Sequence, residues 1–173
     1  YPQALKLDSY FKQCYYRYII TMTVKVFPHR GTKLNLRTIV VKLLAAIPPR
    51  NREVIERRFG LVSGSAETLE AIGQSYHITR ERVRQIQEYG LKKVMQSDKA
   101  ALLGPVFGSI KDYINSRGGV AKESDIFNDL ARSQDCPQLA LVLKLTPDLI
   151  SSKESDELPL RYALNKDTLK AAD

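Results

Sequence analysis

Residues 68–86 read TLEAIGQSYHITRERVRQI, and the pattern of this stretch governs the fold predicted around it. Thr68 precedes a short apolar-periodic run, and Thr79 precedes a longer one. A threonine at such a position predicts a helix start, because its hydroxyl accepts a hydrogen bond from a first-turn amide. Residues 76–78 (YHI) separate the two runs. The pattern therefore predicts two helices joined by a tight turn, which is a helix-turn-helix.

The second predicted helix has an apolar face and a polar face. Its buried stripe is expected on Val83, Ile86, Gly90 and Val94. The opposite, exposed face carries Arg80, Glu81, Arg84, Gln85 and Glu88. In the first helix, Gly73 predicts a close helix crossing, since two packed helices need a small residue at their contact.

Two further helices are predicted before this pair. Apolar residues recur at steps of three and four from Leu36 to Ile47. Pro48 and Pro49 end that helix and begin the next, because a proline at the first helical position loses no hydrogen bond. The next helix, residues 49–59, is expected to end at Gly60 as its C-cap. It is expected to bury Val54, Ile55 and Phe59 and to expose Arg50, Arg52, Glu53, Glu56 and Arg57.

The C-terminal half predicts a second unit. Helices are expected over residues 102–116, 122–130 and 137–145, with Gly118 and Gly119 stopping the first. Two strands are expected at 149–152 and 158–164, around the acidic turn 153–157. Three helices followed by a two-stranded hairpin is the order of a winged helix.

The sequence therefore predicts a mainly α fold, with a four-helix helix-turn-helix domain followed by a small winged-helix (α+β) domain. The expected divisions are an N-terminal tail (1–35), the helix-turn-helix domain (36–96), a joint (97–101), the winged-helix domain (102–165) and a C-terminal tail (166–173). Within the N-terminal tail, residues 21–26 suggest a short strand and residues 5–18 a ragged helix. Because the first residue is Tyr1, we expect the chain to be a piece of a longer one or to lack its true start.

Charge and composition narrow the classes of function. The chain is 43% hydrophobic and 27% charged, as in a soluble globular protein. The net charge of +8 is uneven: residues 1–36 and 37–96 each carry +5, whereas residues 97–173 carry −2. A polyanion such as nucleic acid is therefore expected to meet the first 96 residues. No apolar run approaches the ~20 residues of a membrane span, so we expect a cytoplasmic protein with no membrane partner.

No metal site or catalytic constellation is predicted. The only cysteines are Cys14 and Cys136, and the only histidines are His29 and His77. They have no metal-ligand spacing, and two plain thiols indicate a reducing compartment. Paired carboxylates, a nucleophile with its base, and a phosphate-binding glycine loop are also not evident. We therefore expect a protein that is not an enzyme, with no cofactor and no evident small-molecule ligand.

The polar face of the last helix in the first domain suits recognition of DNA bases. A helix fits the major groove, and its N-terminal residues point at base edges. An arginine fork matches the guanine edge, a glutamate accepts from cytosine, and a glutamine pairs with adenine. Arg80, Glu81, Arg84 and Gln85 occupy that end. The alternative is a solvated face, because Arg–Glu pairs at i, i+4 stabilise a helix unaided.

Residues 36–96 resemble region 4 of the bacterial primary sigma factors of the sigma-70 family, in the segments PPRNREVIERRFGL, TLEAIGQSY and ITRERVRQI. The resemblance implies binding to the −35 promoter element and docking on the beta flap of RNA polymerase. It implies that Arg80, Glu81 and Gln85 read bases, with Arg84 close to the same edge. The phosphate-contacting positions that we expect are Arg50, Arg58, Thr68, Leu69 and Arg82. Departures from the family pattern are Asn51, where the family usually has an acid, Tyr76-His77 and Tyr89-Gly90.

Two further comparisons shape the expected function. No segment resembles sigma region 2, which melts promoters, so these residues are not expected to open a promoter. Residues 102–165 resemble the HARE-type helix-turn-helix, a winged-helix family that includes the delta subunit of RNA polymerase, through IKDYINSRGGVAKESDIFNDL, LALVLKL and ELPLRYAL. Their acidic balance favours a protein partner over DNA.

The sequence thus predicts a transcription factor that reads double-stranded promoter DNA and contacts RNA polymerase. The alternative is a regulator that competes with sigma for the polymerase through protein contacts, without reading DNA.

Overall fold

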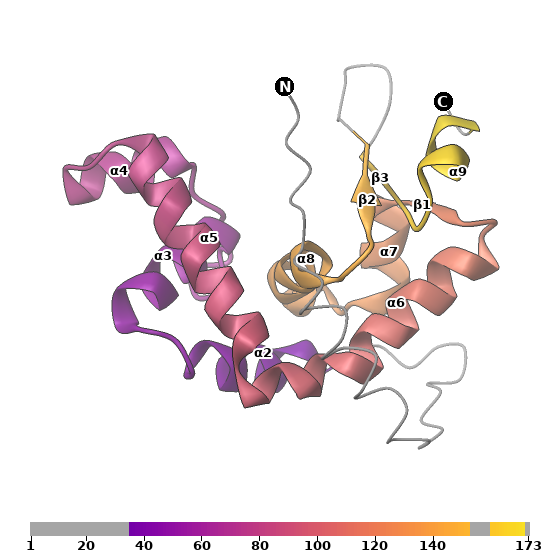
Figure 1. Cartoon of the computed structure of the whole chain (residues 1–173), viewed down its shortest axis with the longest axis horizontal. Helices are drawn as coiled ribbons and strands as arrows, with labels where there is room; N and C mark the ends of the chain where they lie inside the picture. The colour runs from indigo at the N-terminus through magenta and orange to yellow at the C-terminus, as the bar shows by residue number, and fades with distance from the viewer. Residues whose placement is uncertain (1–34, 153–159, 172–173) are drawn as a thin grey trace.

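The computed structural model describes residues 35–152 and 160–171. The N-terminal half of this part forms the predicted four helices: α2 (Leu36–Leu44), α3 (Pro49–Phe59), α4 (Leu69–Tyr76) and α5 (Arg80–Gln96). They lie together on one side of the molecule (Figure 1). The predictions for residues 1–34, including a strand and a helix there, and for the acidic turn at 153–157 fall outside the described residues.

The predicted helix ends are confirmed with one difference. Gly60 ends α3 with a left-handed φ of 66°, which a glycine adopts without a steric cost. Pro48 precedes α3, and Pro49 is its first residue. Helix α2 stops at Leu44, three residues before the predicted end, yet Ile47 is still buried. Its last turn loosens because the chain must become extended before Pro49, and Pro48 has a ψ of 145°.

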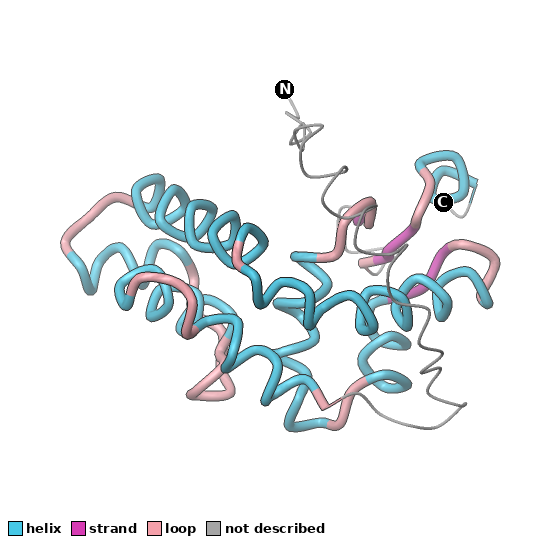
Figure 2. The backbone as a smooth tube through the Cα atoms, turned by 60° about the horizontal axis from the view of Figure 1, so that its bottom comes forward, coloured by secondary structure: helices cyan, strands magenta, loops and turns pink. Residues whose placement is uncertain are grey.

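The C-terminal half has the winged-helix order of helix, strand, two helices and two strands, preceded by a 3₁₀ helix. Its elements are η1 (Asp98–Leu103), α6 (Gly104–Ser116), β1 (Val120–Lys122), α7 (Glu123–Leu130), η2 (Ser133–Asp135), α8 (Cys136–Leu145), β2 (Ile150–Ser151), β3 (Arg161–Ala163) and α9 (Lys166–Ala171). The strands form an antiparallel sheet in the order β1-β3-β2. Most of the described backbone is helical (Figure 2).

Three features of this half differ from the sequence reading. Strand β1 was not predicted, because three residues are too few to reveal an alternating pattern. The predicted polar joint lies largely within η1, whose Leu103 is fully buried. The segment assigned to a C-terminal tail contains helix α9, which contacts β3. No described helix has both the length and the apolar character that crossing a membrane requires.

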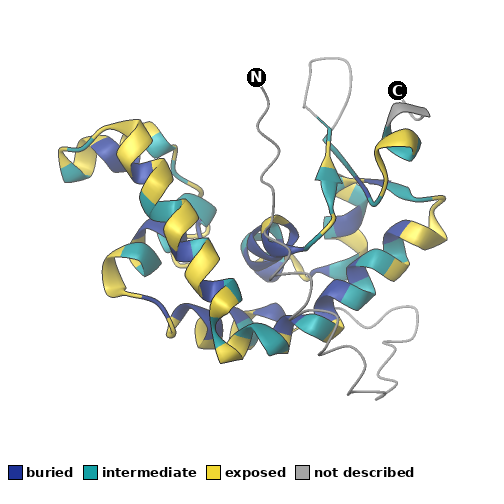
Figure 3. Ribbon diagram, in the orientation of Figure 1, coloured by how far each residue is buried: buried dark blue, intermediate teal, exposed yellow. Residues whose placement is uncertain are grey.

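One apolar core runs across the predicted joint. It combines buried residues of α2, such as Leu43, with Val94 of α5 and Ile110 of α6. Helix α8 lies between the two halves (Figure 1) and contacts both α2 and α3. Six of its ten residues are buried, so it is dark along most of its length in Figure 3. The division into separate domains at residues 97–101 stays a prediction. The apolar core is continuous across these residues.

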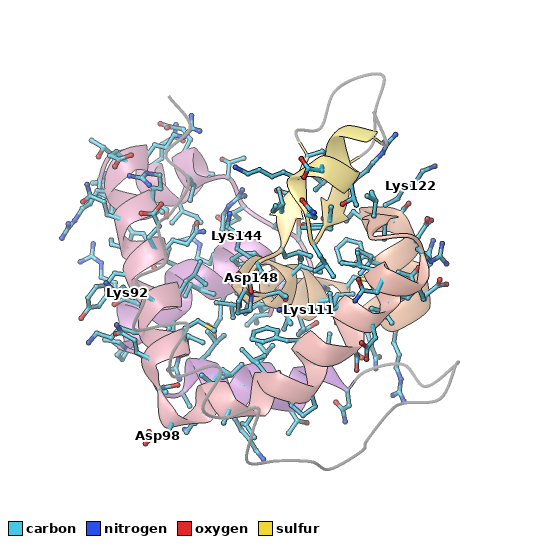
Figure 4. All side chains as sticks on the ribbon, turned by 45° about the vertical axis from the view of Figure 1, so that its right-hand side comes forward. Lys92, Asp98, Lys111, Lys122, Lys144 and Asp148 are labelled. Carbon is cyan, nitrogen blue, oxygen red and sulfur yellow. The ribbon has the colours of Figure 1, made fainter. Side chains whose placement is uncertain are left out.

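A salt bridge fixes the segment after α8 on α6. The Lys111 Nζ atom lies 3.6 Å from the Asp148 carboxylate, and Figure 4 shows the two side chains next to each other. Asp148 has a φ of 62°, so the chain turns sharply at this point before it enters β2.

Substitution of a core residue in α8 is expected to destabilise both halves together. Leu139 is fully buried, and Leu139→Ala is expected to cost about 2–5 kcal/mol in the free energy of unfolding. Hydrogen exchange is expected to show amides of α5 and α6 losing protection in parallel. Val41→Ala, at a residue of α2 that is 63% exposed, serves as the control with an effect within about 0.5 kcal/mol. Unchanged protection in α5 would contradict a shared core.

Candidate nucleic-acid interface

A small apolar cluster fixes the orientation of α5. Each of three helices contributes one fully buried residue to it, namely Val54 of α3, Ile72 of α4 and Val83 of α5. Partly buried residues close the cluster at its edges: Leu69, Tyr76, Ile78 and Ile86. Because α5 contacts both α3 and α4, its apolar stripe faces inward and its polar face is directed away from them.

The turn between α4 and α5 depends on Gly73. The Ile78 amide donates to the Gly73 carbonyl oxygen at 3.0 Å, which folds the chain back against α4. A Cβ atom on Gly73 would lie 2.7 Å from the Ile78 carbonyl oxygen. The predicted need for a small residue is therefore correct, but the close neighbour is the backbone of the turn and not a crossing helix. His77 has a φ of 54°, the left-handed conformation of a helix C-cap, and ends α4 at this turn.

Helices α3 and α5 cross closely where the sequence departs from the sigma pattern. A Cβ atom on Gly90 would lie 2.9 Å from Ile55 Cδ1 and 3.2 Å from Asn51 Cβ. The Asn51 Nδ2 atom donates to the Ile86 carbonyl oxygen at 3.0 Å. An acid at position 51, deprotonated, would have no proton to donate to this carbonyl. Asn51 of α3 and Gly90 of α5 thus belong to the same helix–helix contact.

Helix α5 begins as predicted. The Arg82 amide donates to Thr79 Oγ1 at 3.2 Å, and the Ala71 amide donates in the same way to Thr68 Oγ1 at 3.1 Å. The four predicted base-reading residues, Arg80, Glu81, Arg84 and Gln85, are all exposed on the first turns of α5. Figure 3 shows this exposed face along the outer side of the helix.

The polar residues of that face are linked to one another. Arg84 donates from Nε and Nη2 to the two Glu81 carboxylate oxygens, at 2.8 and 2.7 Å, and from Nη1 to Glu88. These contacts lower the pKa of Glu81 and raise that of Arg84, because each charge is stabilised by its hydrogen-bonded partner. Arg82 donates to Gln85 at 3.1 Å, and Gln85 donates to Glu81 at 3.4 Å.

Arg80 differs from its neighbours on the face. Across residues 35–152 and 160–171, no hydrogen bond or ion pair involves its guanidinium. The sequence predicted a shared role for Arg80 and Arg84. The structure separates them into one unpaired arginine and one arginine held between two carboxylates.

The predicted phosphate-contacting residues have varied surroundings. Arg50 is exposed, with its guanidinium carbon 5.5 Å from the centre of the Tyr76 ring, within cation–π range. Arg58 donates to the Glu67 carbonyl oxygen at 2.7 Å, so it also holds the loop before α4. The Thr68 hydroxyl caps α4, and Leu69 is partly buried. Arg82, bonded to Gln85, is exposed on α5.

Arg57 has a structural role that sequence reasoning missed. It was expected on an exposed face, but its guanidinium donates to both Glu67 carboxylate oxygens, at 2.8 and 2.7 Å, and to Ser75 Oγ at 2.8 Å. It also lies 5.4 Å from the centre of the Tyr76 ring. Arg57 thereby ties α3 to α4 and to the loop between them. Because Arg57 and Glu67 are ten residues apart, no local pattern indicated the pair.

Two capped helices joined by a tight turn, with the second presenting a polar face, define a domain of the helix-turn-helix class. Residues 43–96 match the family model described as Sigma-70, region 4. This part of the chain is therefore a sigma-70 region 4 segment.

Known relatives agree with this assignment. The chain is 41% identical over 79 residues to the RNA polymerase sigma factor SigA of Nostoc sp., and 36% identical over 80 residues to SigA of Clostridium acetobutylicum. It is 40% identical over 79 residues to SigA1 of Synechococcus elongatus. Each similarity covers 46% of this chain but only 18% or 19% of the relative. The chain thus spans less than a fifth of the length of these relatives.

Two mid-helix glycines are expected to respond oppositely to alanine. Gly73→Ala is expected to destabilise the protein by about 1–3 kcal/mol, because its Cβ would collide with backbone that cannot move away cheaply. Gly108→Ala in α6 is the matched control, with no atom within 4 Å of the added carbon. It is expected to stabilise by about 0.5–1 kcal/mol. Urea unfolding measures both, and an equal effect of the two substitutions would contradict the close approach at Gly73.

Stability below neutral pH is expected to depend on Glu67. Its pKa in the folded protein is lowered from the ordinary value of 4.5 by the hydrogen bond from Arg57. The pair therefore contributes to stability above that value, and the contribution is lost as pH falls through the lowered pKa. Glu67→Gln is expected to flatten the acid side of the stability profile. Glu70→Gln, at an exposed residue of α4, is the control and is expected to leave the wild-type slope in place.

Proposed function

We propose that the region 4 segment binds double-stranded promoter DNA of the −35 type, with α5 in the major groove. The observation that supports this most strongly is the N-terminal end of α5. Four side chains able to bond base edges are exposed there, on a helix held by caps and a buried cluster. Helix N-termini in this arrangement point at bases. Arg80, unpaired among the described residues, is the arginine best prepared to fork onto a guanine.

The supporting helices would contact the phosphate backbone. Arg50 lies at the start of α3, and Thr68 and Leu69 lie at the start of α4, where unsatisfied amides favour an anion. Arg58 lies near the end of α3. Arg82 lies beside the exposed face of Arg80, Glu81, Arg84 and Gln85, which is called the reading face below. These contacts would fix the register of α5 on the duplex without reading its sequence.

The same module is proposed to contact RNA polymerase at the beta flap, and the winged-helix half to bind a protein partner. The basic balance of residues 37–96 and the acidic balance of residues 97–173 support this division of labour. We propose a non-catalytic regulator or adaptor. Since none of the 173 residues resembles a promoter-melting segment, we assign promoter recognition and not promoter opening to them.

Arg80→Ala tests the reading role. It is expected to weaken binding to the preferred duplex by about 1–3 kcal/mol and to relax the preference at one base pair. A duplex library with randomised positions, sorted by affinity, measures both effects. Arg132→Ala, which removes an equal charge from an exposed site near η2, is the control and is expected to leave the preference unchanged. A uniform loss on all sequences would make Arg80 a phosphate contact instead.

The salt dependence of binding separates the two candidate functions. A reader that neutralises several phosphates is expected to lose affinity linearly with the logarithm of salt concentration. Absence of duplex binding at low salt would favour a regulator that competes with sigma through protein contacts alone. The carboxylates of Glu81 and Glu88 on the reading face are the feature that gives this alternative its weight.

A further inference from the structure

Glu88 completes a two-sided clamp on the Arg84 guanidinium. Arg84 has five N–H donors: four lie in pairs along two edges, each able to form a two-donor fork, and the fifth is the Nη1 hydrogen on the Cδ side. Glu81 occupies the Nε–Nη2 edge with both carboxylate oxygens. Glu88, four residues further along the helix, contacts Nη1. Each of the three guanidinium nitrogens of Arg84 therefore already donates to a carboxylate.

The two carboxylates differ in what they leave available. A guanine edge needs two parallel donors from the same guanidinium. If Glu81 alone remained, it would orient Arg84 through Nε and one Nη2 hydrogen, and the terminal Nη1–Nη2 edge would be open. Glu88 contacts one of the two nitrogens of this terminal edge, and it places a negative charge beside any acceptor that approaches there. Its side chain is 44% exposed, so the contact lies at the surface.

We propose that Glu88 is a positioning residue that withholds Arg84 from DNA and thereby sets the affinity and base preference of the reading face. This assignment rests on the proposed function, because it concerns the same face of α5. Glu88 competes with a base or phosphate for one donor of Arg84. Binding through the terminal edge of Arg84 therefore competes with the Arg84–Glu88 pair, whereas binding through Arg80 meets no such competition.

The test is Glu88→Gln, which keeps the shape of the side chain and removes its charge. With the charge-assisted contact weakened, the variant is expected to bind its preferred duplex roughly 2- to 5-fold more tightly. Selection from a randomised duplex library is expected to show a sharper preference at one base pair. Glu88→Ala, which removes the acceptor altogether, is expected to give at least as large a gain. Circular dichroism checks that the helix content of both variants equals that of the wild type.

Two controls separate release of Arg84 from simple removal of a negative charge. In an Arg84→Ala background, Glu88→Gln is expected to change affinity no more than Glu70→Gln does in the wild-type chain. Glu70 is an exposed glutamate of α4 outside the clamp. An equal gain with and without Arg84, or an equal gain from Glu70→Gln, would overturn the proposal.

Failure of this assignment is distinguishable from failure of the proposed function. If the wild-type chain binds duplex and Arg80→Ala weakens it, but Glu88→Gln has no effect, only the role of Glu88 is wrong. If neither the wild type nor Glu88→Gln binds any duplex at low salt, both the reading function and the role of Glu88 are wrong.

Discussion

Helix α3 carries two adjacent buried residues that belong to different apolar cores, and the rest of the structure depends on this arrangement. Val54 packs in the small cluster with α4 and α5, whereas Ile55 packs in the large core with α2, α6 and α8. Both residues are fully excluded from solvent. A rotation of α3 that improved one contact would therefore weaken the other. Helix α3 thus lies between the two cores, and contacts on both of its sides fix its position.

The orientation of α5 follows from the position of α3. Gly90 lets α5 approach Ile55 and Asn51, and the hydrogen bond from Asn51 fixes the register of the two helices. Val94, near the end of α5, enters the large core. The N-terminal end of α5 projects from the small cluster, while its C-terminal end is held by the same core as the winged-helix half. The polar face of α5 is thus supported by residues from both halves of the chain.

The parts predicted from the sequence are those determined by local chemistry. Thr68, Thr79 and Gly60 set helix ends through bonds or dihedral angles within a few residues, so their patterns were sufficient. The pairing of Arg57 with Glu67 depends on how a loop folds back, and β1 depends on a partner strand some forty residues away. The Glu81–Arg84–Glu88 clamp lies between these cases. Its i, i+3 and i, i+4 spacing is visible in the sequence, but which edge of Arg84 each acid occupies requires coordinates.

The Glu81–Arg84–Glu88 clamp changes the functional interpretation of the polar face of α5. Exposed ion pairs within a helix contribute little to the stability of a fold, because water and salt screen them. The buried clusters already fix α5, so Glu81 and Glu88 are not needed to hold it in place. At a DNA surface the same carboxylates repel phosphates and compete for arginine donors. Under the proposed function, acids on this face weaken binding to duplex in general, and a base that offers Arg84 a better partner than Glu88 restores part of it. Under the proposed role of Glu88, such a face holds back part of its affinity and of its base preference for as long as the Arg84–Glu88 pair is closed.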